Sequence, residues 1–159
     1  MESSILLLYS FSLHLLGVIL IFRARGISRG TGAGELLVSP APISFLSGVD
    51  PETGTVVEKG HPLEGRSIAG TVLAFDHGKG STVGSYVLYA LQRNGKAPAA
   101  IINTRADPII AVGAIIGNIP MVDQPEVAIG RLRPGTRVVV DGTEGTVAYE
   151  GDLLPEPGA

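Results

Sequence analysis

The stretch from residue 67 to residue 103 constrains the fold of this chain more than any other. Residues 67–75 are apolar and rich in β-branched side chains, which is typical of a strand. Apolar residues at helical spacing follow over 82–93, and 98–103 is a second short apolar run. A strand, a helix and a strand in this order predict a crossover between parallel strands. We therefore expect a parallel strand pair with a helix packed on it.

The rest of the chain is rich in turn residues and short apolar runs, which favours a sheet-rich domain. Further strands are expected at 18–24, 35–39, 43–46, 55–57 and 119–123, and a hairpin is expected from 137–140 and 145–149. Residues 106–118 are ambiguous, because their isoleucines suit a short buried helix while two glycines weaken it. Residues 26–34 read as a glycine-rich loop, and His61 as an exposed residue of a polar loop. The predicted fold class is α/β and β-rich, a barrel or a sandwich with one or two helices packed on it.

Composition excludes several classes of function. The chain has 159 residues, of which 45% are hydrophobic, so it is long enough for one domain with a real core. Its net charge of −3 leaves no basic footprint for nucleic acid. Cysteine is absent, so the chain offers neither a thiol nucleophile nor thiolate ligands, and its three histidines are scattered. We therefore expect no metal site held by this chain alone.

The N-terminal segment has two interpretations. Residues 5–22 are almost wholly apolar and about as long as a membrane span, and arginines follow them. Residues 17–25, however, look like the first strand of the domain, which cannot also be the end of a membrane helix. We favour an extension at 1–16, as an upstream start codon would add, followed by a domain at 17–150 and a flexible tail at 151–159. This interpretation predicts a cytoplasmic protein, and sequencing the native N-terminus would decide between it and a membrane anchor.

The loop Gly78-Lys-Gly-Ser-Thr82 is the main candidate site. A glycine-rich turn between a strand and a helix directs backbone N–H groups toward an anion, and the helix dipole assists. Lys79 adds a positive charge, and Ser81 and Thr82 place hydroxyls at the helix start, where they can also act as simple caps. The spacing is not that of a nucleotide-binding P-loop. The residues alone thus predict an anion-binding loop with a hydroxyl at its tip.

Four motifs together resemble the swivelling domain of aconitase-like hydro-lyases, and most closely the aconitase X group. They are Gly26-Ile-Ser-Arg-Gly30, Pro42-Ile-Ser-Phe-Leu46 with Gly48-Val-Asp-Pro51, Gly78-Lys-Gly-Ser-Thr82 with Gly84-Ser-Tyr-Val87, and Ala97-Pro-Ala-Ala-Ile-Ile-Asn103. The resemblance runs from about residue 21 to residue 147. It implies a swivel domain with barrel-like sheets and flanking helices. It also implies that this domain closes over a large partner subunit in a heterodimer, with the 4Fe-4S cluster bound by that partner. The resemblance to archaeal members implies the dehydration of (R)-5-phosphomevalonate to trans-anhydromevalonate 5-phosphate. Bacterial relatives dehydrate cis-3-hydroxy-L-proline instead.

The resemblance also implies roles for residues of this chain. Ser81 corresponds to the serine base of the aconitase loop, and the implied substrate-binding residues are Lys79, Gly80, Thr82, Arg29 and Ser28. Aconitases have an arginine where this chain has Val83, so Arg29, or with less support Arg66 or Arg105, must replace that contact. No membrane or nucleic-acid partner is expected. The alternatives are the hydroxyproline substrate and a non-enzymatic β-domain that binds an anion, and co-purification with a cluster-bearing chain would exclude the second.

Overall fold

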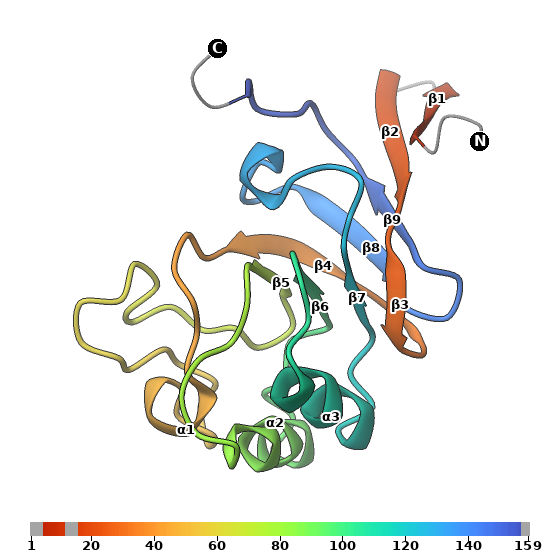
Figure 1. The fold of residues 1–159 in the computed structure, drawn as a ribbon. Helices are drawn as coiled ribbons and strands as arrows, with labels where there is room; N and C mark the ends of the chain where they lie inside the picture. Colours follow the sequence, from red (N-terminus) through yellow and green to blue (C-terminus); the bar gives the residue numbers. More distant parts are fainter. Residues whose placement is uncertain (1–4, 12–15, 157–159) are drawn as a thin grey trace.

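The computed structural model describes residues 5–11 and 16–156, and Figure 1 shows how its elements are arranged. The described strands are β1 (Ile5–Phe11), β2 (Leu16–Arg23), β3 (Arg25–Ser28), β4 (Thr31–Val38), β5 (Val72–Phe75), β6 (Ala100–Asn103), β7 (Met121–Asp123), β8 (Arg137–Asp141) and β9 (Thr146–Tyr149). The described helices are α1 (Phe45–Gly48), α2 (Gly84–Arg93) and α3 (Pro108–Ile116), with a 3-10 turn, η1, at Ile129–Arg131.

The strands form one curled sheet in the order β1-β2-β9-β8-β4-β5-β6-β7-β3. β2 and β3 are two halves of one chain segment, interrupted at Ala24, whose N–H donates to the carbonyl of Gly145 at 2.9 Å. β2 pairs with β9 near one end of the strand order, and β3 pairs with β7 at the other end. The continuous segment that carries β2 and β3 therefore connects the two ends of the sheet. The sheet therefore closes into a barrel-like shape, which confirms the expected fold class.

β5 and β6 are buried on both faces, which explains their continuous apolar sequences. Their side chains alternate between two cores. Leu73 and Ile101 pack toward the helices, whereas Val72 and Ile102 pack into the interior of the barrel. β4, β5, β6 and β7 are mutually parallel, so the predicted crossover is confirmed.

The three helices lie side by side on one face of the parallel strands, at the bottom of Figure 1. Helix α3 resolves the ambiguity at residues 106–118. The side chain of Asp107 accepts hydrogen bonds from the N–H groups of Ile109 and Ile110, and Pro108 occupies the first turn, where its missing N–H costs nothing.

Three sequence predictions in this part of the fold were wrong. Residues 26–34 are not a loop but β3 and β4 around a turn at Arg29 and Gly30. A Cβ atom on Gly32 would lie 1.9 Å from the carbonyl oxygen of Ala99, so glycine here permits close packing of two backbones. Residues 43–46 begin helix α1 rather than a strand, since short apolar runs suit either. The strand expected at 67–75 starts only at Val72, after a turn in which Gly70 has a φ of 69°.

The N-terminal predictions are tested only in part. Ile5–Phe11 pairs antiparallel with β2, while residues 1–4, 12–15 and 157–159 lie outside the described residues. Within the described ranges, no helix has the length and apolar character needed to cross a membrane. The assignment of 1–16 as an extension stays a prediction.

An ion pair connects β3 and β7, which are neighbouring strands at one end of the strand order. Asp123, at the end of β7, is fully buried and accepts hydrogen bonds from Arg25 Nε at 2.8 Å and from an Arg25 terminal nitrogen at 2.7 Å. Burial by itself raises the pKa of Asp123, but the hydrogen bonds from Arg25 and the Ala106 N–H, with the charges of Arg25 and Arg105, outweigh it. The pKa of Asp123 therefore lies below its ordinary value of 3.8.

This pair predicts how stability changes in acid. The pKa of Asp123 is lower in the folded than in the unfolded protein. Its contribution to the free energy of unfolding is therefore complete above about pH 4 and is lost as the pH falls through the pKa of the folded state. In Arg25→Gln the carboxyl group stays buried without its cation, so its pKa rises toward that of the unfolded protein. The variant is then expected to be less stable than the wild type at pH 7, and this deficit shrinks as the pH falls. Urea unfolding midpoints between about pH 3 and pH 7 measure this deficit.

Arg137→Gln is the matched control, because it breaks an exposed ion pair in which Arg137 Nε lies 3.5 Å from Glu150 Oε2. This control is expected to keep the pH profile of the wild type, since exposed pairs contribute little. Parallel profiles for Arg25→Gln and the wild type would contradict the role given to Asp123.

Candidate active site at the carboxyl edge of the parallel strands

The carboxyl ends of four parallel strands meet at one edge of the sheet. The segments that follow β4, β5, β6 and β7 therefore gather at this edge. In open parallel sheets this edge is where ligands bind. The predicted loop, residues 78–82, follows β5 and lies in this group.

A small pocket of about 160 Å³ opens beside this loop. Its lining combines the loop with the start of α2 and the start of α3, and consists of Phe45, Gly78, Lys79, Gly80, Ser81, Gly84, Asp107, Ile109 and Ile110. One wall is apolar, and the loop supplies the hydroxyl and the ammonium group. The structure thus brings together the predicted residues Lys79, Gly80 and Ser81.

Asp107 holds the loop against helix α3. Its Oδ2 accepts a hydrogen bond from the N–H of Gly78 at 3.0 Å, while its Oδ1 caps α3 through the N–H groups of Ile109 and Ile110. The N–H of Lys79 donates to the carbonyl of Ile43 at 3.0 Å. Sequence reasoning missed Asp107, although an aspartate followed by proline before an apolar run is a helix-start signal.

Gly80 allows the loop to pass close to helix α1. Its φ of +94° is rarely adopted by residues with a side chain, and an added Cβ would lie 2.8 Å from the hydroxyl of the buried Ser44. Ser44 precedes α1 and its hydroxyl lies 3.4 Å from that of Ser47. The backbone of the loop is therefore held by Asp107 and by the carbonyl of Ile43, and at Gly80 it passes close to Ser44.

Ser81 lies in the loop just before helix α2, and no side chain in the described residues caps α2. Its Oγ accepts a hydrogen bond from the N–H of Val83 at 3.1 Å, as in a turn that precedes a helix, and the residue also lines the pocket. The hydroxyl hydrogen has no acceptor in the part of the chain that the structure describes. A donor directed at the oxygen stabilises its deprotonated form, and so does the N-terminus of α2, which begins at Gly84.

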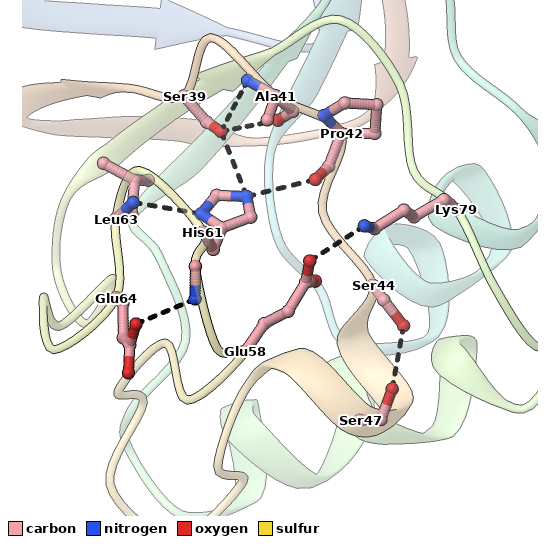
Figure 2. A network of polar contacts seen from close by, with 11 residues as sticks. Ser39, Ala41, Pro42, Ser44, Ser47, Glu58, His61, Leu63, Glu64 and Lys79 are labelled. Atoms are coloured by element: carbon pink, nitrogen blue, oxygen red, sulfur yellow. Dashed lines mark hydrogen bonds and ion pairs between the residues drawn. The ribbon is translucent and has the colours of Figure 1, made fainter.

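Lys79 is not the free cation that the sequence suggested. Its Nζ lies 2.9 Å from Oε2 of Glu58, an ion pair visible in Figure 2. Glu58 comes from a connection 21 residues earlier, and no sequence pattern linked the two. The pair reduces the positive charge that the loop presents to an anion.

His61 is buried, so the prediction of an exposed histidine was wrong. Its Nδ1 accepts a hydrogen bond from the N–H of Leu63 at 3.0 Å, which leaves Nε2 as the donor to the carbonyl of Pro42 at 3.1 Å. Figure 2 shows how this ring joins the segment before α1 to the connection that carries Glu58. Because both ring nitrogens of His61 have hydrogen-bond partners, burial of the ring costs little free energy. His61 therefore stabilises the two segments that it connects.

The other predicted residues are not brought to the pocket. Ser28 is buried, and its hydroxyl donates to the carbonyl of Ala114 at 3.3 Å. Ala114 lies about 6 Å along α3 from Ile110, the last pocket residue of this helix, at a rise of about 1.5 Å per residue. Arg29 is exposed in the turn that directly follows Ser28, and it does not line the pocket. Thr82, Arg66 and Arg105 are exposed and outside the pocket lining.

The chain does not carry ligands for an iron–sulfur cluster. Its sequence contains no cysteine. Over residues 5–11 and 16–156, no group of three or more histidine, cysteine, aspartate or glutamate side chains is placed to hold a metal ion. The 4Fe-4S cluster implied by the resemblance therefore does not fit the residues of this chain.

Comparison with known proteins identifies the class of protein. The aconitase X swivel domain family matches residues 21–149. The chain belongs to this family. The crystal structure of Thermococcus kodakaraensis aconitase X in its holo form resembles it with a TM-score of 0.77 and 49% sequence identity, over 85% of this chain and 98% of that one.

Archaeal relatives give a more particular comparison. A Methanosarcina mazei protein named phosphomevalonate dehydratase small subunit is 58% identical over 127 residues, or 79% of this chain and 88% of that protein. The Methanocella arvoryzae protein of the same name is 58% identical over 126 residues, or 79% of this chain and 96% of that protein.

The contact between Gly80 and Ser44 predicts a specific loss of stability. Alanine at position 80 would have to adopt a positive φ, which costs about 1–2 kcal/mol of folding free energy. Its Cβ would in addition force the Ser44 hydroxyl to move. Gly60→Ala is the matched control, since Gly60 has a φ of +78° and open space around its Cβ position. We expect Gly80→Ala to lower the free energy of unfolding more than Gly60→Ala does, as measured by urea denaturation.

The double variant Ser44→Ala/Gly80→Ala tests the cause. Without the hydroxyl, the nearest Ser44 atom is its Cβ at 3.5 Å, an ordinary contact. The double variant should recover part of the loss. Additive losses would show that the hydroxyl does not fix the loop.

Proposed function

We propose that this chain is the small subunit of a cytoplasmic phosphomevalonate dehydratase. This hydro-lyase would convert (R)-5-phosphomevalonate to trans-anhydromevalonate 5-phosphate in an archaeal-type mevalonate pathway of isoprenoid biosynthesis. The names of the archaeal relatives support the substrate over cis-3-hydroxy-L-proline. The observation that carries the proposal is the position of Ser81. This residue lines the pocket, and its Oγ accepts a hydrogen bond from a backbone N–H at the start of a helix.

In this proposal Ser81 is the proton acceptor. Its deprotonated Oγ takes the proton from the carbon next to the substrate carboxylate, a C=C bond forms, and the C–O bond on the neighbouring carbon breaks. The departing hydroxide takes a proton from solvent to become water, and Ser81 returns its own proton to solvent. A serine is a very weak base, so its deprotonated form needs stabilisation. The N–H of Val83 and the N-terminus of α2 supply this stabilisation from within the chain. Asp107 and the carbonyl of Ile43 contribute by holding the loop in place.

We further propose that the partner is a large subunit that binds the 4Fe-4S cluster. The small-subunit names of the relatives imply a larger partner chain. The absence of cysteine from the sequence supports placing the cluster on that partner. The pocket beside Ser81 would then be one half of an active site that the heterodimer completes.

Lys79 is proposed to bind an anionic group of the substrate. Lys79 is the cationic residue in the pocket lining, and its Nζ pairs with Glu58 Oε2 at 2.9 Å. The substrate would replace Glu58 as its partner. Because Arg29, Arg66 and Arg105 do not line the pocket, the remaining charges on the substrate would be matched by the large subunit.

The serine assignment predicts the effect of Ser81→Ala. In the complex of both subunits, this variant should lower kcat for dehydration of (R)-5-phosphomevalonate by about 10²- to 10⁴-fold, the usual contribution of a positioned base. Ser47→Ala removes a hydroxyl near the loop but outside the pocket lining and should keep activity. Size-exclusion chromatography confirms that both variants assemble. Near-normal turnover by Ser81→Ala would remove the base assignment.

The ion pair predicts opposite effects for its two members. Lys79→Gln should raise KM for phosphomevalonate about tenfold or more, because a charged hydrogen bond to the substrate is lost. Glu58→Gln should lower KM, since it removes the competing anion. Steady-state kinetics at fixed ionic strength measure both. An unchanged KM in Lys79→Gln, with a raised KM in Arg29→Gln, would transfer substrate binding to Arg29.

A further inference from the structure

The outer face of helices α2 and α3 is apolar and exposed. Tyr86 and Tyr89 of α2 are 67% and 43% exposed, and Val112, Ile115 and Ile116 of α3 are 49%, 53% and 42% exposed. Val83, which immediately precedes α2, is 45% exposed. We call these six residues the helical strip. A gathering of large exposed apolar side chains of this kind usually marks an interaction surface.

The two helices place these side chains along one seam. α2 and α3 pack closely at Ser85 and Gly113, where a Cβ on Gly113 would lie 3.1 Å from the Ser85 Cα. Tyr89 follows Ser85 by one helical turn, and Val112 and Ile116 flank Gly113 on α3. Tyr89 and Ile116 therefore lie beside the contact line of the two helices, and Figure 1 shows the two helices side by side.

The strip begins at the candidate active site. Val83 donates its N–H to Ser81, and Gly84 and Ile109 of the same two helices line the pocket. A protein that completes the pocket therefore approaches at the end of the strip where α2 and α3 begin. The sequences of α2 and α3 carry one charged residue, Arg93, at the far end of α2. Aromatic and aliphatic side chains without charge are typical of the centre of a stable interface.

We propose that the helical strip is the docking surface for the large subunit. This inference rests on the proposed function, since it takes its partner from there. Docking along the strip would place the large subunit against the apolar side of the helices and over the Ser81 pocket at once. The same contact would cover the exposed side chains and exclude water from the pocket.

The test uses the co-expressed pair of subunits and measures assembly without substrate. Val112→Asp and Tyr86→Asp place a charge on α3 and on α2 within the strip. Each is expected to weaken the affinity for the large subunit by about 30-fold or more, as loss of a central interface contact does. Val57→Asp is the matched control, because Val57 is 45% exposed but lies outside the strip. Co-purification and isothermal titration give the affinities, and circular dichroism confirms that each variant is folded.

Each outcome is decisive. A loss of binding in both strip variants, with wild-type binding by Val57→Asp, supports the proposal. Equal binding by all three variants overturns it, and so does a wild-type chain that does not bind the large subunit. If the strip variants only convert a homodimer of this chain to a monomer, the strip joins two copies instead. A stable complex that fails to dehydrate phosphomevalonate would overturn the proposed reaction but not the docking surface.

Discussion

The burial of β5 and β6 on both faces is the constraint on which the rest of the structure depends. Val72, Leu73, Ile101 and Ile102 are completely buried, and each such side chain contributes about 1.5–3 kcal/mol when it leaves water. Two-sided burial requires the helices on one face and the closed part of the sheet on the other. These strands are parallel and joined by crossovers, so the loops that follow them meet at one edge. The position of the candidate site is thus a consequence of how the core is built.

Two carboxylates then bind groups of the loop at this edge. Asp107 holds the loop backbone through Gly78, and Glu58 holds the ammonium group of Lys79. Ser81 receives its hydrogen bond from the backbone of the following helix, so its oxygen is positioned without help from another side chain. The chain supplies a positioned hydroxyl and one paired cation, but no cysteine for a cluster. In the proposed function such a site is half of an active site, and the exposed apolar helices beside it are the proposed surface for the other half.

The sequence predicted those features that depend on local pattern and missed those that depend on contacts between distant segments. The strand, loop and helix around Ser81 were predictable, because hydrophobic period and glycine content identify them, and four joint motifs identified the family. The burial of His61 was not, because it depends on partners from two segments, Pro42 and Leu63. Glu58 reaches Lys79 across 21 residues, with no pattern to connect them. Ser28 and Arg29 were grouped with the loop by resemblance, whereas the structure places Ser28 against the second half of α3.

The central claim is that this chain completes an active site only together with its partner. Its most direct test is to titrate a fixed amount of cluster-loaded large subunit with this chain and to measure water loss from (R)-5-phosphomevalonate by the formation of the unsaturated product. The account predicts no turnover by either chain alone, and a rate that rises with added chain and saturates near equal amounts of the two. Full activity of the large subunit alone, or an unchanged rate across the titration, would contradict it.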